Sequence, residues 1–294
     1  MPLDPLSERD VEPDFADEHA AAQAAGFSIG LLDMDALIEG DTRAACRKLG
    51  GRSGPALLRG WMLRPTDYAR LDTALHTRDI ALITAPAHYE ACHHLPGWYD
   101  RLAGGTPRSV WVPGSPPPLS ACLEALSALG SEAAIVKDYV KSHKHAWAEA
   151  CFIPDTSDLD HAGRVIAAFL AYQGDGLSGG VVLRAFEALR PAGPHPESGM
   201  PRSVEARIFV LDGRPLVSLA YWPGVALGEG PPDAALAPVL AAIDSPLYTV
   251  DFAQKTDGTW MVMEVGDGQV SGLQGTDPVA FYRALADGLS GRGP

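Results

Sequence analysis

The sequence predicts an α+β protein in which a smaller α/β lobe precedes a larger domain. Three observations lead to this prediction: strand-like and helical segments alternate up to about residue 112, two β-hairpin patterns occupy the second half, and helical patterns lie between the hairpins. Alternation is typical of a parallel sheet, whereas hairpins with intervening helices indicate helices packed on an antiparallel sheet. The chain has 294 residues, of which 46% are hydrophobic and 20% charged, and is long enough for two such units.

The first part of the chain divides into a leader and a lobe. Residues 1–25 are acidic and contain prolines, which predicts a mobile leader with a helix near its end, and residues 26–112 form the expected α/β lobe. Apolar periodicity places strands at 27–34, 56–63 and 79–85 and helices at 35–48, 65–78 and 87–102. These elements predict a small parallel sheet.

A stretch rich in Pro and Gly at 112–120 marks the expected boundary, and the larger domain is expected over residues 119–290. Its expected elements, in chain order, are a strand at 133–142, a helix at 159–173, a strand at 179–189, a hairpin at 204–222, a helix at 232–243, a hairpin at 247–270 and a helix at 277–289. The hairpins are expected to turn at Asp212-Gly213 and Asp257-Gly258.

Charge and cysteine usage narrow the partners and the compartment. The 37 acidic residues outnumber the 23 basic ones, giving a net charge of −14. Such a surface repels nucleic acid and anionic membranes, so neither is an expected partner. No apolar run approaches about 20 residues, the length that a membrane helix needs. The four cysteines form no CxxC pair, which favours reduced thiols and a cytoplasmic location.

The lysines are concentrated in one place. Only five occur, and Lys137, Lys141 and Lys144 fall within eight positions. If the segment is a strand, Lys137 and Lys141 share a face because their separation is even. Two ammonium groups on one face suit a polyphosphate ligand. A solvated edge strand guarded by lysines is the alternative.

Three carboxylates form the acidic half of the expected site. Counting outward from the turn at Asp257-Gly258 places Asp251 opposite Glu264 on one face of the hairpin. Directly opposed carboxylates repel, unless a divalent cation with a preference for oxygen ligands lies between them. Asp267, in the following Gly-rich bend, can supply a further oxygen. Exposure of these carboxylates to solvent is the alternative, but the hairpin is apolar.

Two further strands carry charged residues. Glu205 and Arg207 share a strand face at the start of the first hairpin, and the strand that contains Arg184 ends near Glu187. Cationic strands together with opposed carboxylates are the parts of a Mg–ATP site built on antiparallel sheets.

The order of these residues resembles the ATP-grasp superfamily. It is most similar to an uncharacterised ATP-grasp subgroup named for two arginines and one lysine. The resemblance covers nearly the whole chain after the leader, and single residues on a sheet carry it. The segments that carry it are Arg59–Met62, His94–Tyr99, Lys137, Arg184–Glu187, Glu205–Arg207, Asp251 and Glu264–Gln269.

The resemblance implies an ATP-grasp fold with an N-terminal pre-ATP-grasp-like lobe, and ATP between two α+β lobes. It implies that Lys137 contacts the α-phosphate, with Lys141 as a second phosphate ligand. Glu187 would bind the ribose or mark the adenine hinge, and Glu205 would also belong to the nucleotide site. Arg207 would face the transferred phosphate.

The remaining carried-over roles concern catalysis and metal. Arg184 and Lys141 are the further catalytic candidates beside Arg207. Asp251, Glu264 and Asp267 would hold two Mg²⁺ ions; the family's Glu-x-Asn motif has Gly266 in place of Asn, so Asp267 or Gln269 must replace that ligand.

The expected function is that of an ADP-forming carboxylate–amine or carboxylate–thiol ligase that works through an acyl-phosphate. Its expected substrates are ATP and an amino acid, a peptide or another small molecule. A phosphotransferase without ligation and a nucleotide-binding regulatory module are the alternatives. The oligomeric state is left open, with a homodimer as one alternative.

Overall fold

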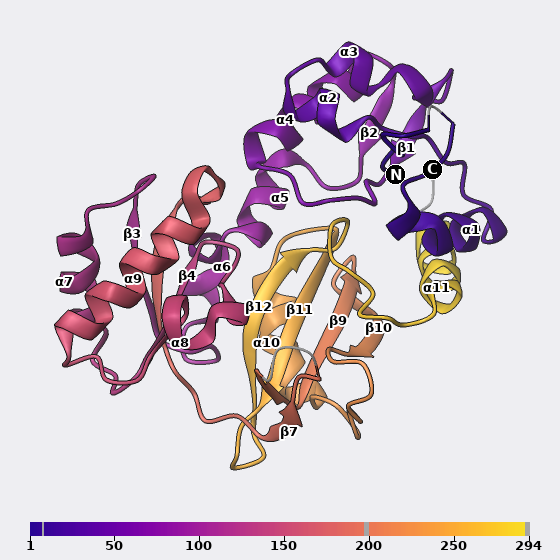
Figure 1. Ribbon diagram of the computed structural model, residues 1–294. Helices are drawn as coiled ribbons and strands as arrows, with labels where there is room; N and C mark the ends of the chain where they lie inside the picture. Colours follow the sequence, from indigo (N-terminus) through magenta and orange to yellow (C-terminus); the bar gives the residue numbers. More distant parts are fainter. Residues whose placement is uncertain (8, 197–199, 292–294) are drawn as a thin grey trace.

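The computed structural model describes residues 1–7, 9–196 and 200–291, and it confirms the α+β prediction (Figure 1). Two four-stranded antiparallel sheets form the larger part of the molecule, with strand orders β3-β6-β4-β5 and β10-β9-β11-β12. The N-terminal lobe contains a two-stranded sheet of its own, and a short pair, β7 with β8, accompanies the second large sheet. None of the helices in these described ranges is both long and apolar enough to span a membrane.

The N-terminal lobe has a parallel pair, as expected, but less strand than the sequence predicts. Its elements are α2 (Met34–Ile38), α3 (Thr42–Ala45), η2 (Arg47–Leu49), β1 (Gly54–Ala56), α4 (Pro65–His76), β2 (Ile80–Leu82), α5 (Pro86–His93), α6 (Leu95–Trp98) and η3 (Tyr99–Leu102). Residues 27–34 form only an isolated bridge, Leu32 with Pro2. Residues 57–63 form no strand, because the N–H groups of Leu58 and Leu63 donate to the side chains of Gln269 and Tyr89.

The first large sheet carries helices on one face. Its strands are β3 (Ser109–Pro113), β4 (Ala134–Asp138), β5 (Phe152–Ile153) and β6 (Gly180–Ala185), accompanied by α7 (Leu119–Leu129), η4 (Lys144–Ala146), α8 (Trp147–Ala150), α9 (Leu159–Gln173) and η5 (Gly174–Gly176). Leu126 of α7 and Phe169 of α9 pack with Val136 and Leu183 of the sheet. Because β3 pairs with β6, the structure places residues 109–113 in this sheet and not at the end of the N-terminal lobe.

Strand β4 ends earlier than the sequence predicts. The Asp138 carboxylate accepts hydrogen bonds from the backbone N–H groups of Val140 and Lys141, which turns the chain. Lys141 therefore lies beyond the strand, so the prediction that Lys137 and Lys141 share a strand face is wrong.

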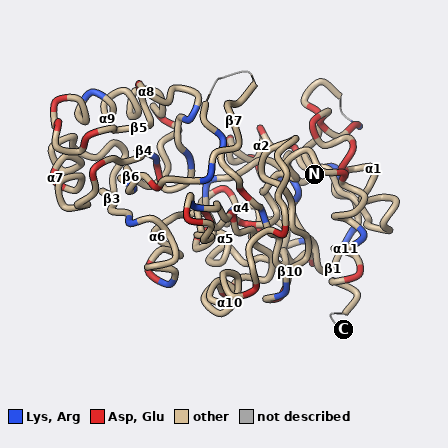
Figure 2. Tube along the Cα trace, turned by 90° about the horizontal axis from the view of Figure 1, so that it is seen from below, with Lys and Arg blue, Asp and Glu red and all other residues tan. Residues whose placement is uncertain are grey.

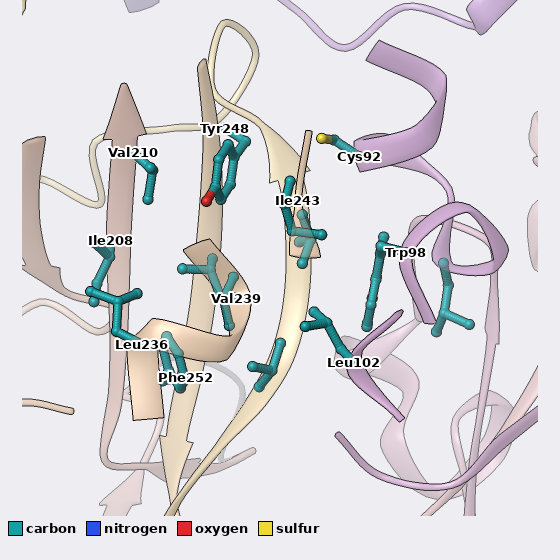
Figure 3. Close-up of a cluster of buried hydrophobic side chains, with 14 of the residues drawn as sticks. Cys92, Trp98, Leu102, Ile208, Val210, Leu236, Val239, Ile243, Tyr248 and Phe252 are labelled. Carbon is teal, nitrogen blue, oxygen red and sulfur yellow. The ribbon is translucent and has the colours of Figure 1, made fainter. Parts of the chain in front are cut away.

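The second large sheet contains both predicted hairpins. Its strands are β9 (Glu205–Leu211), β10 (Arg214–Ala220), β11 (Leu247–Gln254) and β12 (Trp260–Asp267), and β7 (Pro191–Pro194), β8 (Pro201–Ser203) and α10 (Asp233–Ala242) complete this part. The first hairpin turns at Asp212 and Gly213 with φ of 50° and 70°, the left-handed values that a tight hairpin turn requires. Side chains of β9, β11, α10 and α6 form the core beneath this sheet (Figure 3).

The N-terminal segment packs against the body, which corrects the expectation of a mobile leader. It contains η1 (Pro13–Phe15) and α1 (Ala16–Ala24), and α1 lies beside the C-terminal helix α11 (Pro278–Ser290). Glu18 forms an ion pair of 2.8 Å with Arg59 and accepts a hydrogen bond from Tyr282. The acidic charge of this segment is thus partly used in contacts with the body.

Candidate active site

A cavity of about 630 Å³ lies between the two large sheets and is lined by residues of both. This volume is in the range of small-molecule and cofactor sites. Figure 2 shows basic and acidic positions close together in this central region, where β4 and β6 approach the second sheet. All nine residues that the sequence singled out line the cavity: Lys137, Lys141, Arg184, Glu187, Glu205, Arg207, Asp251, Glu264 and Asp267.

Three of these residues form a row across the second sheet. Arg207 of β9 is paired directly with Asp251 of β11, and Asp251 is paired directly with Glu264 of β12. The register confirms that Asp251 lies opposite Glu264, as the hairpin count predicts. A bulge follows Asp251, so Met263 is the extra residue on β12. The row therefore presents one cation and two carboxylates on the cavity side of the sheet.

Each carboxylate of the row has a cationic partner. Nε and Nη2 of Arg207 each donate to an Asp251 oxygen at 2.8 Å, a bidentate geometry. Burial lowers the pKa of Arg207, but Asp251 outweighs this effect and holds the pKa above its ordinary value. Lys137, from β4 of the facing sheet, donates to Oε1 of Glu264 at 3.1 Å. Burial raises the pKa of Glu264, yet Lys137 and Lys144 outweigh it, so the carboxyl stays ionised.

Asp267 does not join the other two carboxylates. It lies an odd number of positions after Glu264, so its side chain belongs to the other face of β12. Its Oδ1 accepts hydrogen bonds from the backbone and the side chain of Gln269, whereas Oδ2 has no hydrogen-bond partner in the described part of the chain. Among the described residues, no three His, Cys, Asp or Glu side chains gather as a metal cluster. The expected three-carboxylate set is therefore not assembled.

Gln269, the other expected replacement ligand, is used to join the lobes. Its Oε1 accepts from the backbone N–H of Leu58, and its Nε2 donates to the hydroxyl of Tyr68 at 2.7 Å. Both partners belong to the N-terminal lobe. These buried contacts leave the amide committed to structure.

We expect Asp267→Asn to remove a pH dependence of stability. Burial raises the pKa of Asp267 from 3.8 to about 7, so the folded protein holds this proton more tightly than the unfolded chain does. The free energy of unfolding of the wild type should therefore fall as pH rises from about 4 to about 7, by about 1.4 kcal/mol for each unit of pKa shift. Urea unfolding at a series of pH values measures this fall.

Asp257→Asn is the matched control, because Asp257 lies in an exposed turn and hydrogen bonds to Thr259 lower its pKa. The control should leave the fall between pH 4 and pH 7 in place. An unchanged fall in Asp267→Asn would contradict the assignment.

The remaining expected residues occupy different parts of the cavity. Glu187 follows β6 and forms an ion pair of 3.5 Å with Lys255. Glu205 is buried and accepts hydrogen bonds from Trp222 at 3.0 Å and from Ser203. It therefore supports the cavity wall at Trp222.

Arg184 is a buried cation that ties the two sheets together. Its Nη2 donates to the Thr106 hydroxyl at 2.7 Å and to the Val262 carbonyl of β12, and its Nε has no acceptor among the residues that the structure describes. Burial lowers its pKa to about 10, against the effect of Glu264. Arg184 therefore adds positive charge near Glu264 without neutralising it by direct contact.

Sequence reasoning left three cavity residues without a role. Lys144 belongs to the lysine cluster, but it has no place in an even-spaced strand pattern. Tyr221 and Trp222 follow β10 and line the cavity opposite η4. The lysine count was a signal for the first of them, and no motif marks the two aromatic residues.

The comparisons with known proteins agree with this geometry. A family model matches residues 128–285, more than half of the chain, and describes an ATP-grasp domain of family 3 in the clade named for two arginines and one lysine. The chain belongs to this ATP-grasp family. The resemblance to the ATP-grasp superfamily and to that subgroup is thereby confirmed.

Solved structures confirm the ATP-grasp fold. D-cycloserine synthetase DcsG has a TM-score of 0.58 at 17% identity, covering 93% of this chain and 94% of that one. The ATP-grasp ligase PsnB, in complex with a precursor variant, Mg and ADP, has a TM-score of 0.54 at 15% identity, covering 94% and 92%. N5-carboxyaminoimidazole synthetase from Staphylococcus aureus, in complex with ADP, has a TM-score of 0.59 at 12% identity, covering 92% and 73%. No curated protein matches this ATP-grasp chain in sequence.

Proposed function

We propose that this ATP-grasp protein is an ADP-forming ligase that activates a carboxylate as an acyl-phosphate, which an amine or a thiol then attacks. The observation that carries the proposal is the row Arg207–Asp251–Glu264, which faces Lys137 across the cavity. Family membership and the ATP-grasp ligases of similar fold support an ATP-dependent ligase. The proposed substrates are an amino acid, a peptide or another small molecule.

Asp251 and Glu264 fit a magnesium site, whereas Asp267 does not. The first two are directly opposed carboxylates on the cavity wall, and hard oxygen ligands are what Mg²⁺ prefers. The Mg and ADP bound together in PsnB support the same cofactors here. Mg²⁺ would be held by Asp251 and Glu264, and when bound it would neutralise part of the phosphate charge.

The chain's own residues would bind and orient the reactants. Lys137 and Arg207 place positive charge on the two facing walls, where it stabilises negative charge that develops during phosphoryl transfer. Asp251 fixes the Arg207 guanidinium by two hydrogen bonds, which limits the reorganisation that the reaction requires. The surrounding walls exclude water, so these charges act more strongly than they would in solvent.

The test is coupled detection of ADP and orthophosphate over pairs of amino acids and peptides. A ligase releases both products in equal amounts and forms an amide or thioester that mass spectrometry detects. ADP release with a phosphorylated acceptor and no orthophosphate would show a phosphotransferase. Saturable nucleotide binding without turnover over the whole panel would favour a regulatory module.

We expect Mg–ATP to raise the melting temperature and ATP with chelator to have a much smaller effect. The two opposed carboxylates repel a polyphosphate unless a cation lies between them. A ligand at about 100 times its Kd adds about 2.7 kcal/mol, which shifts the melting temperature by a few degrees. Differential scanning fluorimetry measures both shifts, with chelator alone as the control. Equal shifts with and without Mg²⁺ would contradict the proposed metal contact.

A further inference from the structure

Lys144 joins the two walls of the cavity. It begins η4, in the segment that follows β4, and its side chain reaches residues that follow β10 of the other sheet. Its Nζ lies 5.8 Å from the ring centroid of Tyr221 and 5.9 Å from that of Trp222. Lys144 is exposed and lines the cavity, so a ligand can reach its ammonium group.

The other cations near the expected metal carboxylates already have partners. Lys137 is paired with Glu264 at 3.1 Å, and Arg207 with Asp251 at 2.8 Å. Lys144 forms no ion pair with any carboxylate of the described residues, and within that part of the chain its two aromatic contacts hold the ammonium in place. A cation–π contact of this kind contributes about 0.5–2 kcal/mol, and a charge-assisted hydrogen bond to phosphate about 1.5–3 kcal/mol. A phosphate oxygen can therefore replace the aromatic pair as a partner.

The charge around Lys144 points to the same ligand. Lys144, Lys137 and Arg184 all act on Glu264, so three cations surround one carboxylate. This excess of positive charge lies in a protein of net charge −14 and is suited to a polyanion. Lys141, by contrast, lies on the exposed turn after β4, where its backbone N–H bonds to Asp138.

We propose that Lys144 is a nucleotide ligand that binds the β- and γ-phosphates of ATP, taking the second phosphate-binding role that the sequence assigned to Lys141. This inference rests on the proposed function, because it requires an ATP site in the same cavity. On binding, the ammonium exchanges its contacts with Tyr221 and Trp222 for phosphate oxygens. No bond of the nucleotide is made or broken in this step.

The experiment compares two nucleotides that differ only in the phosphates concerned. Dissociation constants for Mg–ATP and for AMP are measured by isothermal titration calorimetry on the full chain. The proteins are the wild type, Lys144→Met, Lys144→Arg, Lys141→Met and the control Lys48→Met, whose lysine does not line the cavity. Lys144→Met should weaken Mg–ATP at least tenfold and change AMP less than twofold. Lys144→Arg should recover most of the Mg–ATP affinity, and Lys48→Met should match the wild type.

Three results would overturn the inference while leaving the proposed function in place. The first is unchanged Mg–ATP affinity in Lys144→Met. The second is an equal loss of Mg–ATP and AMP affinity, which would show a role in the adenosine pocket or in folding. The third is a loss in Lys141→Met as large as that in Lys144→Met. A wild type that binds neither nucleotide would instead overturn the proposed function and this inference with it.

Discussion

Replacing Glu264 by glutamine is expected to lower kcat by at least a hundredfold, on the order of 3 kcal/mol. The carboxylate links the row across the second sheet to the facing sheet, through Lys137 at 3.1 Å. The substitution keeps the size and one oxygen but removes the charge that would hold Mg²⁺ beside the phosphates. Its effect should therefore appear in the transition state more than in substrate binding.

The folded state should tolerate this change. The Glu264 side chain is 36% exposed, so its ion pair with Lys137 is partly screened and contributes at most about 1 kcal/mol. Glu229→Gln is the matched control, because Glu229 is exposed and lies outside the cavity. Steady-state kinetics and thermal melting of both variants give the measurement. Wild-type turnover by a folded Glu264→Gln would show that this hairpin does not carry the chemistry.

Arg59→Met is expected to destabilise the protein by about 3–5 kcal/mol, the cost of breaking a buried ion pair. The Arg59 side chain is 3% exposed and donates to both carboxylate oxygens of Glu18 at 2.9 Å. Its Nη1 also donates to the carbonyls of Gly268, Gln269 and Ser271 at 2.9–3.0 Å. Methionine fills much of the volume but leaves a carboxylate and three carbonyls without their donor.

Urea unfolding followed by circular dichroism measures this loss. Arg70→Met is the control, because the Arg70 side chain is 41% exposed and its ion pair with Asp67 lies on one helix. Such an exposed pair contributes less than about 1 kcal/mol. Similar unfolding midpoints for the two variants would show that Arg59 does not hold the lobes together.

The sequence predicts best those features that depend on neighbouring positions. The opposition of Asp251 and Glu264 follows from counting along one hairpin, and the count holds although the connecting loop is longer than two residues. The turn at Asp212-Gly213 follows from residues that tolerate positive φ. Both depend on a few consecutive residues, so periodicity and turn chemistry suffice.

Features that depend on distant parts of the chain could not be predicted in this way. Strand β3 was placed in the wrong sheet because its partner, β6, lies about seventy residues later. The pairing of Arg207 with Asp251 joins two hairpins, and nothing within either hairpin specifies it. The early end of β4 has a different cause: the side-chain oxygens of Asp138 accept from the following backbone, and this local competition removed Lys141 from the strand.

The contacts of Arg59 and Gln269 also bear on the order in which the chain folds. Arg59 reaches carbonyls more than 200 positions away, and Gln269 reaches Tyr68 across 201 positions. Contacts of such sequence separation form slowly, because a long loop must close before they stabilise anything. During synthesis, the N-terminal lobe leaves the ribosome first, yet its buried donors and acceptors find their partners only after the loop that follows β12 has been made. The first lobe to be translated is therefore among the last to complete its native packing.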